Sequence, residues 1–76
     1  MTKEQQDLVL NNVKLVTYLV TKYYPNSDFD EYIGIGNYGL VKAAITFDPT
    51  KGYKFGTYAA RVIQNQLGMS FNAETG

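Results

Sequence analysis

Aromatic and cationic side chains gather in the segment GYKFGTYAARVIQN, which covers residues 52–65. They are Tyr53, Lys54, Phe55, Tyr58 and, one helical turn further on, Arg61. Aromatic faces stack on unpaired bases for about 1 to 3 kcal/mol per base, and nearby cations attract the phosphate backbone. The segment therefore suits single-stranded nucleic acid. Phe55 and Tyr58 at helical spacing are equally typical of core residues, so this segment alone leaves both interpretations open.

The residue types that carry most enzyme chemistry are missing from the sequence. It holds no cysteine and no histidine, which excludes disulfide frameworks, thiol catalysis and the usual zinc sites. The acidic group Asp28, Asp30 and Glu31 is better explained as the start of a helix than as a catalytic pair. We therefore expect a protein that is not an enzyme, needs no cofactor or metal and functions in the cytoplasm.

The charges balance overall but are distributed unevenly. Seven basic residues match seven acidic ones, so the strong positive field of an autonomous duplex-DNA binder is absent. Between residues 42 and 61 a single carboxylate, Asp48, accompanies four cations, which are Lys42, Lys51, Lys54 and Arg61. We expect any nucleic-acid contact to lie in this later half of the chain and to be weak in isolation.

A chain of 76 residues is either one small domain or a fragment of a larger protein. Chains near this length bury only about 60% of the surface that they expose when unfolded, so the core is thin. The polar amino end lacks the apolar run of a signal peptide, and no apolar stretch approaches the length of a bilayer crossing. We expect a single soluble domain over residues 1–76 that makes no membrane contact.

Apolar residues at helical spacing predict three helices, over about residues 3–24, 28–46 and 55–71. Pro25 ends the first of them. Asp28, followed three residues later by Glu31, provides a capping-box-like start for the second.

The segment FDPTKGYKF is predicted to be a turn, because Pro49 fixes one backbone angle and Gly52 can adopt a positive one. Beyond the third helix we expect residues 72–76 to be frayed. These features predict an all-α fold, a small bundle of three helices.

Three glycines interrupt the apolar stripe of the second predicted helix, at positions 34, 36 and 39. Each costs up to about 1 kcal/mol in a helix interior. Close approach of another backbone is one explanation, and a smooth surface for a partner helix is the other. Both explanations stay open at this point.

Four blocks of sequence, in a fixed order, resemble a known family. They are an opening with Asn12, Leu15 and Val16, the acidic entry to the second helix, the run GNYGLVKA over residues 36–43, and FDPTKGYKFGTYA over residues 47–59. Over about Leu8 to Leu67 the chain closely resembles region 2 of bacterial sigma factors, the promoter-recognition subunits of RNA polymerase. The pattern is most similar to that of sporulation and other alternative sigma factors. The resemblance implies a helical, non-enzymatic transcription initiation domain.

In that family the second helix docks on a coiled coil of the beta-prime subunit of core RNA polymerase. The resemblance implies a docking face made of Glu31, Gly34, Ile35, Asn37, Tyr38 and Val41. Primary sigma factors have polar and acidic residues at the positions of Gly34 and Ile35. An exposed isoleucine beside Tyr38 is explained if polymerase covers it. The alternative is that Ile35 packs on the first helix.

The third block of the family captures flipped bases of the non-template strand at the minus-ten promoter element, at a cost in stacking and pairing. The DNA-binding residues that the resemblance implies are Phe47, Lys51, Tyr53, Lys54, Phe55, Thr57, Tyr58, Arg61, Gln64 and Asn65. Tyr58 is the residue expected to replace the upstream base pair in the stack. Lys51, Lys54 and Arg61 are expected to contact phosphates, which orient the strand without reading it.

The start of the third helix departs from primary sigma factors, which carry two adjacent tryptophans where this chain has Arg61 and Val62. We therefore expect weaker promoter melting and stricter promoter dependence. The amides of Gln64, Asn65 and Gln66 follow, in the region that reads the upstream edge of the element. Amides can pair with adenine edges, which would suit an A·T-rich site, although consecutive polar residues are equally typical of a solvated helix face.

The expected partners are core RNA polymerase, through beta-prime, and the single-stranded minus-ten element of promoter DNA. An alternative interpretation is a truncated sigma-like regulatory module that binds polymerase or an anti-sigma factor without melting DNA. A helix-turn-helix duplex binder is disfavoured, because the predicted turn is too long and the net charge is zero.

Overall fold

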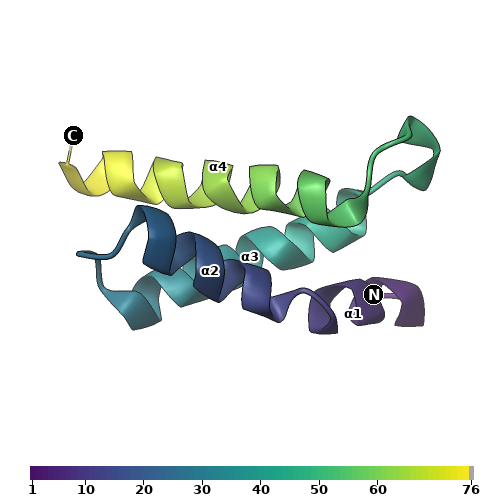
Figure 1. The fold of residues 1–76 in the computed structure, drawn as a ribbon, viewed down its shortest axis with the longest axis horizontal. Coiled ribbons are helices and arrows are strands. Elements are labelled where there is room, and N and C mark those ends of the chain that lie inside the picture. Colours follow the sequence, from purple (N-terminus) through teal and green to yellow (C-terminus); the bar gives the residue numbers. More distant parts are fainter. Residues whose placement is uncertain (76) are drawn as a thin grey trace.

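Helices account for most of the computed structural model, which describes residues 1–75 (Figure 1). In chain order the elements are α1 (Lys3–Leu10), α2 (Val13–Tyr23), α3 (Phe29–Thr46), the 3-10 helix η1 (Pro49–Lys51) and α4 (Phe55–Thr75). The all-α class is confirmed. The predicted count of three helices is wrong, because the described residues form four α-helices.

The helix predicted over residues 3–24 is divided at Asn11 and Asn12. The Asn12 side chain donates from Nδ2 to the Leu8 carbonyl at 2.7 Å, where a continuous helix would place the Asn12 backbone amide. That amide donates instead to the Val9 carbonyl, 3.1 Å away. Asparagine side chains compete with backbone hydrogen bonds in this way, which makes them poor residues for a helix interior. A short α1 followed by a separate α2 is the result.

The bounds of α3 agree with the prediction. Asp28 is its N-cap, and the Asp28 Oδ1 accepts from the backbone N–H of Glu31 at 3.0 Å. Asp30 and Glu31 place negative charge in the first turn, where the helix dipole favours it. The helix ends at Thr46, since the following residue has extended backbone angles.

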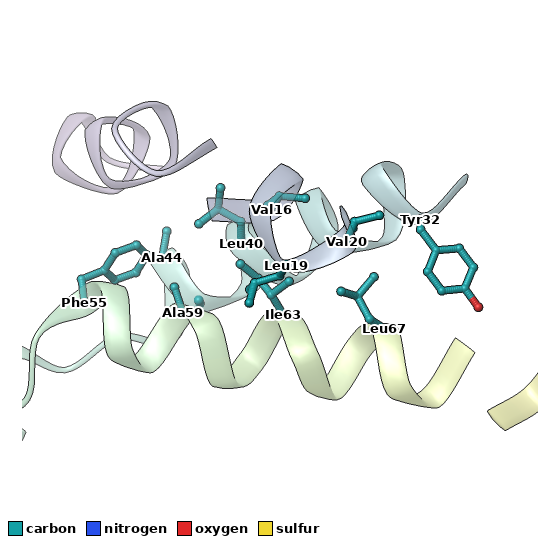
Figure 2. Close-up of a cluster of buried hydrophobic side chains, with 11 residues drawn as sticks. Val16, Leu19, Val20, Tyr32, Leu40, Ala44, Phe55, Ala59, Ile63 and Leu67 are labelled. Carbon is teal, nitrogen blue, oxygen red and sulfur yellow. The ribbon is translucent and has the colours of Figure 1, made fainter. Parts of the chain in front are cut away.

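The core lies between α2, α3 and α4 (Figure 2). Its buried side chains are Val16, Leu19 and Val20 from α2, Tyr32, Leu40, Ala43 and Ala44 from α3, and Phe55, Ala59, Ile63 and Leu67 from α4. The α4 residues are four apart and form a single stripe along one side of that helix. Figure 2 shows Phe55 at one end of the cluster and Tyr32 at the other. The aromatic segment therefore begins inside the core.

Two glycines of α3 allow neighbouring helices to approach closely. A Cβ added at Gly39 would lie 3.0 Å from the Cα of Ile63 in α4, and one added at Gly36 would lie 2.5 Å from Cγ1 of Val16 in α2. Close approach therefore explains both positions. Gly34 differs, because nothing lies within 4 Å of a Cβ added there.

The last helix, α4, continues to Thr75, whereas the sequence predicts its end at residue 71 and fraying beyond it. The buried Tyr32 donates from its hydroxyl to the Glu74 carboxylate at 3.0 Å, which fastens the end of α4 to the start of α3. The residues predicted to fray are thus helical as far as the structure describes them. Residue 76 lies outside the described residues.

Candidate nucleic-acid and protein interfaces

The connection between α3 and α4 lies at one end of the bundle (Figure 1). Asp48 caps η1, because its Oδ1 accepts from the Thr50 hydroxyl at 2.6 Å and from the Thr50 backbone N–H at 2.9 Å. The same two hydrogen bonds lower the pKa of Asp48 below its ordinary value. Gly52 follows with a φ of 84°, a left-handed conformation that glycine adopts without strain. This turn directs the chain into α4.

Four aromatic rings meet at this connection, with Phe47 in the centre. The Phe47 centroid lies 5.2 Å from that of Phe55, in an edge-on arrangement. It lies 5.8 Å from the Tyr58 centroid and 6.0 Å from the Tyr53 centroid. Tyr53 and Tyr58 stack on each other at 5.6 Å, with 25° between their planes. Rings at such separations attract one another. We call these four residues the aromatic corner.

The rings of the aromatic corner differ in exposure. Phe55 is only 8% exposed, so we reassign it from the expected DNA contact to a support beneath Phe47. Tyr53 is 41% exposed and offers the most accessible ring of the corner. Tyr58 is half-buried, and its hydroxyl lies 2.7 Å from the Oγ1 of Thr46. The Tyr58 ring is therefore held in place by a hydrogen bond as well as by stacking.

Tyr58 separates two hollows on the surface. A hollow of about 180 Å³ is lined by Tyr53, Thr57, Tyr58 and Arg61. A larger one of about 530 Å³ lies between α3 and α4 and is lined by Lys42, Thr46, Tyr58, Val62, Asn65, Gln66 and Met69. The smaller hollow combines two phenol rings with a hydroxyl and a guanidinium group. That combination suits a flat base attached to a phosphate.

The remaining predicted DNA-binding residues lie around these hollows or on the exposed surface. Asn65 is exposed and lines the larger hollow. Lys51, Lys54 and Gln64 are exposed but line neither hollow. Lys42 also lines the larger hollow, although the sequence suggested it only as part of the local excess of cations. No local sequence signal assigns Lys42 to the site, because only the packing of α3 on α4 brings it to the same hollow as Asn65.

The predicted polymerase-binding residues lie along the side of α3 that faces away from the core. Those that are exposed are Glu31, Gly34, Asn37 and Tyr38, and those that are half-buried are Ile35 and Val41. Ile35 packs partly against the core, so a structural role accounts for part of its apolar character. Tyr38 is 62% exposed. Apolar surface of this kind is typical of an interface.

Ile45 extends this side of α3 and was not assigned from the sequence. It is 54% exposed and lies one turn beyond Val41. Gly34, Tyr38, Val41 and Ile45 recur at three- and four-residue intervals, which is the signal that could have identified Ile45. We call these four residues and Ile35 the outer face of α3.

An acidic pair lies at the opposite end of α3 from the aromatic corner. The pKa of Glu31 is raised above its ordinary value, first by repulsion from Glu74 and then by some loss of hydration and by repulsion from Asp28. Negative charge is thus concentrated near the start of α3 and the end of α4. DNA is not expected to approach this end.

Two kinds of site are not found within residues 1–75. No group of histidine, cysteine, aspartate or glutamate side chains is arranged to hold a metal ion. No helix in that range combines the length and the hydrophobicity that a bilayer crossing requires.

Comparison with known proteins assigns the fold to a family. The family model for Sigma-70 region 2 matches residues 8–74, which is most of the chain. The chain belongs to the sigma-70 region 2 family. The matched residues of this sigma-70 region 2 domain include α2, α3 and almost all of α4. The aromatic corner and the outer face of α3 therefore both lie inside the region that defines the family.

Curated relatives of this sigma-70 region 2 chain are named as sigma factors. It is 40% identical over 61 residues to the RNA polymerase sigma-E factor of Clostridium acetobutylicum, which covers 79% of this chain and 26% of the relative. It is 38% identical over 61 residues to the RNA polymerase sigma-K factor of Bacillus subtilis, with 79% and 21% covered. It is 40% identical over 66 residues to RNA polymerase sigma factor SigA of Microcystis aeruginosa, with 86% and 16% covered. The chain thus spans about a quarter or less of the length of these relatives.

Proposed function

We propose that this domain takes part in transcription initiation without performing chemistry itself. In the proposal, the outer face of α3 binds the beta-prime coiled coil of core RNA polymerase, and the aromatic corner holds flipped non-template bases of the promoter minus-ten element. The stacked Tyr53 and Tyr58 rings, beside a hollow lined by Thr57 and Arg61, are the observation that carries the DNA part. Membership of the sigma-70 region 2 family supports the whole.

The geometry accounts for how a base would be held. Removing a base from duplex DNA costs a few kcal/mol in stacking and pairing. A tyrosine ring returns about 1 to 3 kcal/mol per stacked base. Because the Tyr58 hydroxyl is already bound to Thr46 and its ring to Tyr53, little conformational freedom remains to be lost on binding. Arg61 and Lys54 are exposed nearby and supply charge for the phosphates.

The docking part rests on the exposed apolar side chains of α3. Tyr38 and Ile45 are 62% and 54% exposed, and both belong to the outer face of α3. Gly34 lies on the same face with open space around it, so a partner helix can approach the α3 backbone closely there. Packing within the domain does not explain Gly34, whereas docking of a partner helix does.

Two tyrosine variants test the two parts separately. Tyr53→Ala is expected to weaken binding of a single-stranded A/T-rich minus-ten oligonucleotide by about 5- to 150-fold, measured by fluorescence anisotropy with polymerase present, because one stacking face is lost. Its capture of core polymerase without DNA stays unchanged. Tyr38→Ala, a matched loss of an exposed tyrosine, reduces capture of polymerase instead. Equal DNA binding by Tyr53→Ala and wild type, with polymerase bound normally, refutes base capture.

A second candidate function is a regulatory module that binds polymerase or an anti-sigma factor without melting DNA. The burial of Phe55 favours it, because one of the expected DNA contacts is withdrawn into the core. The absence of a tryptophan pair at Arg61 and Val62 also favours it. Loss of polymerase capture in Tyr38→Ala together with no oligonucleotide binding by wild type would select this candidate.

A further inference from the structure

Thr46 is the last residue of α3, and its hydroxyl makes two short contacts. The Thr46 Oγ1 donates to the Lys42 carbonyl, one turn earlier in α3, at 2.8 Å. The same oxygen lies 2.7 Å from the hydroxyl of Tyr58 in α4. Thr46 was not assigned a role from the sequence. It nevertheless links the backbone at the end of α3 to a tyrosine that is proposed to hold a base.

The directions of these two hydrogen bonds follow from the number of protons. A hydroxyl group has one proton to donate and two lone pairs that accept. Because Thr46 donates its proton to the Lys42 carbonyl, the proton between Thr46 and Tyr58 comes from Tyr58. The Tyr58 hydroxyl therefore donates to Oγ1 of Thr46 and has no second proton for a phosphate oxygen. Its hydrogen bond serves to fix the ring.

Thr46 is a stiff acceptor for this hydrogen bond. Threonine is branched at Cβ, so its χ1 angle has few allowed values in a helix, and the bond from Oγ1 to the carbonyl four residues earlier selects among them. That carbonyl belongs to the backbone of α3, which packs closely on α4 where Gly39 meets Ile63. The Tyr58 hydroxyl is thus attached through Thr46 to the backbone of a packed helix.

The ring of Tyr58 needs this attachment because stacking restrains it in one direction only. One face of the ring lies on Tyr53, with the two centroids 5.6 Å apart. Stacking sets the distance between two rings but leaves them free to slide over each other. Tyr53 is itself 41% exposed, so it offers a mobile support. The hydrogen bond to Thr46 restrains the Tyr58 ring within its own plane, which is the freedom that stacking leaves.

We propose that Thr46 is a positioning residue for base capture and acts through Tyr58. By accepting from the Tyr58 hydroxyl, Thr46 holds the ring in the orientation in which it meets an unpaired base. Less side-chain freedom is then lost when the strand binds. Thr46 contributes to DNA affinity in this way without touching the strand. The inference rests on the proposed function, because it requires that Tyr58 contacts the captured base.

A double-mutant cycle on Thr46 and Tyr58 tests this assignment. Thr46→Val removes the hydroxyl and keeps the branched shape, whereas Tyr58→Phe keeps the stacking ring and removes the hydroxyl. Each is expected to weaken binding of the single-stranded minus-ten oligonucleotide about two- to tenfold, measured by fluorescence anisotropy with core polymerase present, because the Tyr58 side chain then loses more freedom on binding. The double variant should bind no more weakly than either single variant, since both substitutions remove the same hydrogen bond.

Two further threonine variants separate positioning from a general effect of losing a hydroxyl. Thr46→Ser keeps the hydroxyl without the branched carbon and should bind the oligonucleotide more tightly than Thr46→Val does. Thr21→Val is the matched control, because Thr21 also donates from Oγ1 to a carbonyl four residues earlier, that of Thr17 at 2.9 Å, but in α2. It should bind the oligonucleotide as wild type does. Capture of core polymerase without DNA should be unchanged in all of these variants.

Three results overturn the inference. Additive losses in the double variant would show that Thr46 and Tyr58 act independently. Normal binding by Thr46→Val, while Tyr53→Ala binds weakly, would show that the hydrogen bond positions nothing that matters for capture. Equal losses of oligonucleotide binding and of polymerase capture in Thr46→Val would show that Thr46 only stabilises the fold. Failure of the proposed function looks different, because Tyr53→Ala and Tyr58→Ala then both leave binding of the single strand unchanged.

Discussion

Two glycines on the same helix predict opposite effects of the same substitution. An alanine replaces glycine in a helix interior with a gain of about 0.8 to 1 kcal/mol. At Gly34 nothing lies within 4 Å of the added Cβ, so the whole gain is expected as stability. At Gly39 the Cβ would lie 3.0 Å from the Cα of Ile63, which is backbone and cannot rotate away.

The cost at Gly39 follows from the α3–α4 interface, which is the most extensive contact between helices of this fold. Overpacking a well-packed site costs about 1 to 3 kcal/mol. After the gain in helix propensity is subtracted, Gly39→Ala should be less stable than wild type by up to about 2 kcal/mol. A domain of this size has only about 3 to 5 kcal/mol in total, so the upper end would halve its stability.

Urea unfolding followed by far-ultraviolet circular dichroism measures both variants. Gly34→Ala should raise the midpoint and Gly39→Ala should lower it, with no change in the slope m for either. If Gly39→Ala is as stable as Gly34→Ala, then the close helix packing described above is wrong. Capture of core polymerase is a second measurement on Gly34→Ala. If this variant is more stable than wild type but captures less polymerase, Gly34 belongs to the docking surface.

Three other substitutions probe the two ends of the bundle. Tyr32→Phe removes the hydrogen bond to Glu74 and should lower the thermal midpoint by a few degrees, with the loss of helicity confined to the last turns of α4. The pKa of Glu31 is higher in the folded state than in the unfolded state, where it is about 4.3. Wild type therefore loses stability as the pH rises from the pKa of the unfolded state through the pKa of the folded state. The difference in thermal midpoint between Glu31→Gln and wild type should therefore increase in favour of Glu31→Gln between about pH 4 and pH 7. A difference that does not change with pH would contradict the repulsion between Glu31 and Glu74. Phe47→Leu removes the central ring of the aromatic corner and should cost about 0.5 to 1.5 kcal/mol per lost ring pair in urea unfolding, together with weaker binding of the minus-ten oligonucleotide.

Local signals in the sequence were sufficient for α3 but not for the first and last helices. The Asp28 cap and the apolar spacing determine where α3 begins and ends. The break before α2 depends on a single side-chain hydrogen bond from Asn12, which the apolar period of its neighbours conceals. The extension of α4 depends on Tyr32, whose partner Glu74 lies 42 residues away along the chain. Periodicity contains no information about such a contact.

The candidate site was predicted in its residue types and less well in its geometry. Aromatic spacing identified Tyr53, Tyr58 and Phe55 together, but it could not tell that Phe55 turns into the core while Tyr53 remains exposed. That distinction depends on the turn at Gly52, which sets the direction from which α4 starts. Lys42 was missed because it belongs to a different helix from Asn65, and only the packing of α3 on α4 brings both to one hollow.

The two proposed functions meet within one turn of α3. Ile45 ends the outer face, and the next residue, Thr46, lies 2.7 Å from the hydroxyl of Tyr58. A partner that covered Ile45 would therefore restrain Thr46, the residue that orients the tyrosine proposed to hold a base. Because Thr46 and Tyr53 already hold the Tyr58 ring, only the small freedom that remains can be removed, so docking on polymerase is expected to favour DNA binding slightly and without any change in the average structure. If both proposed functions hold, a domain of zero net charge is expected to bind DNA weakly alone and more strongly when it is docked on polymerase.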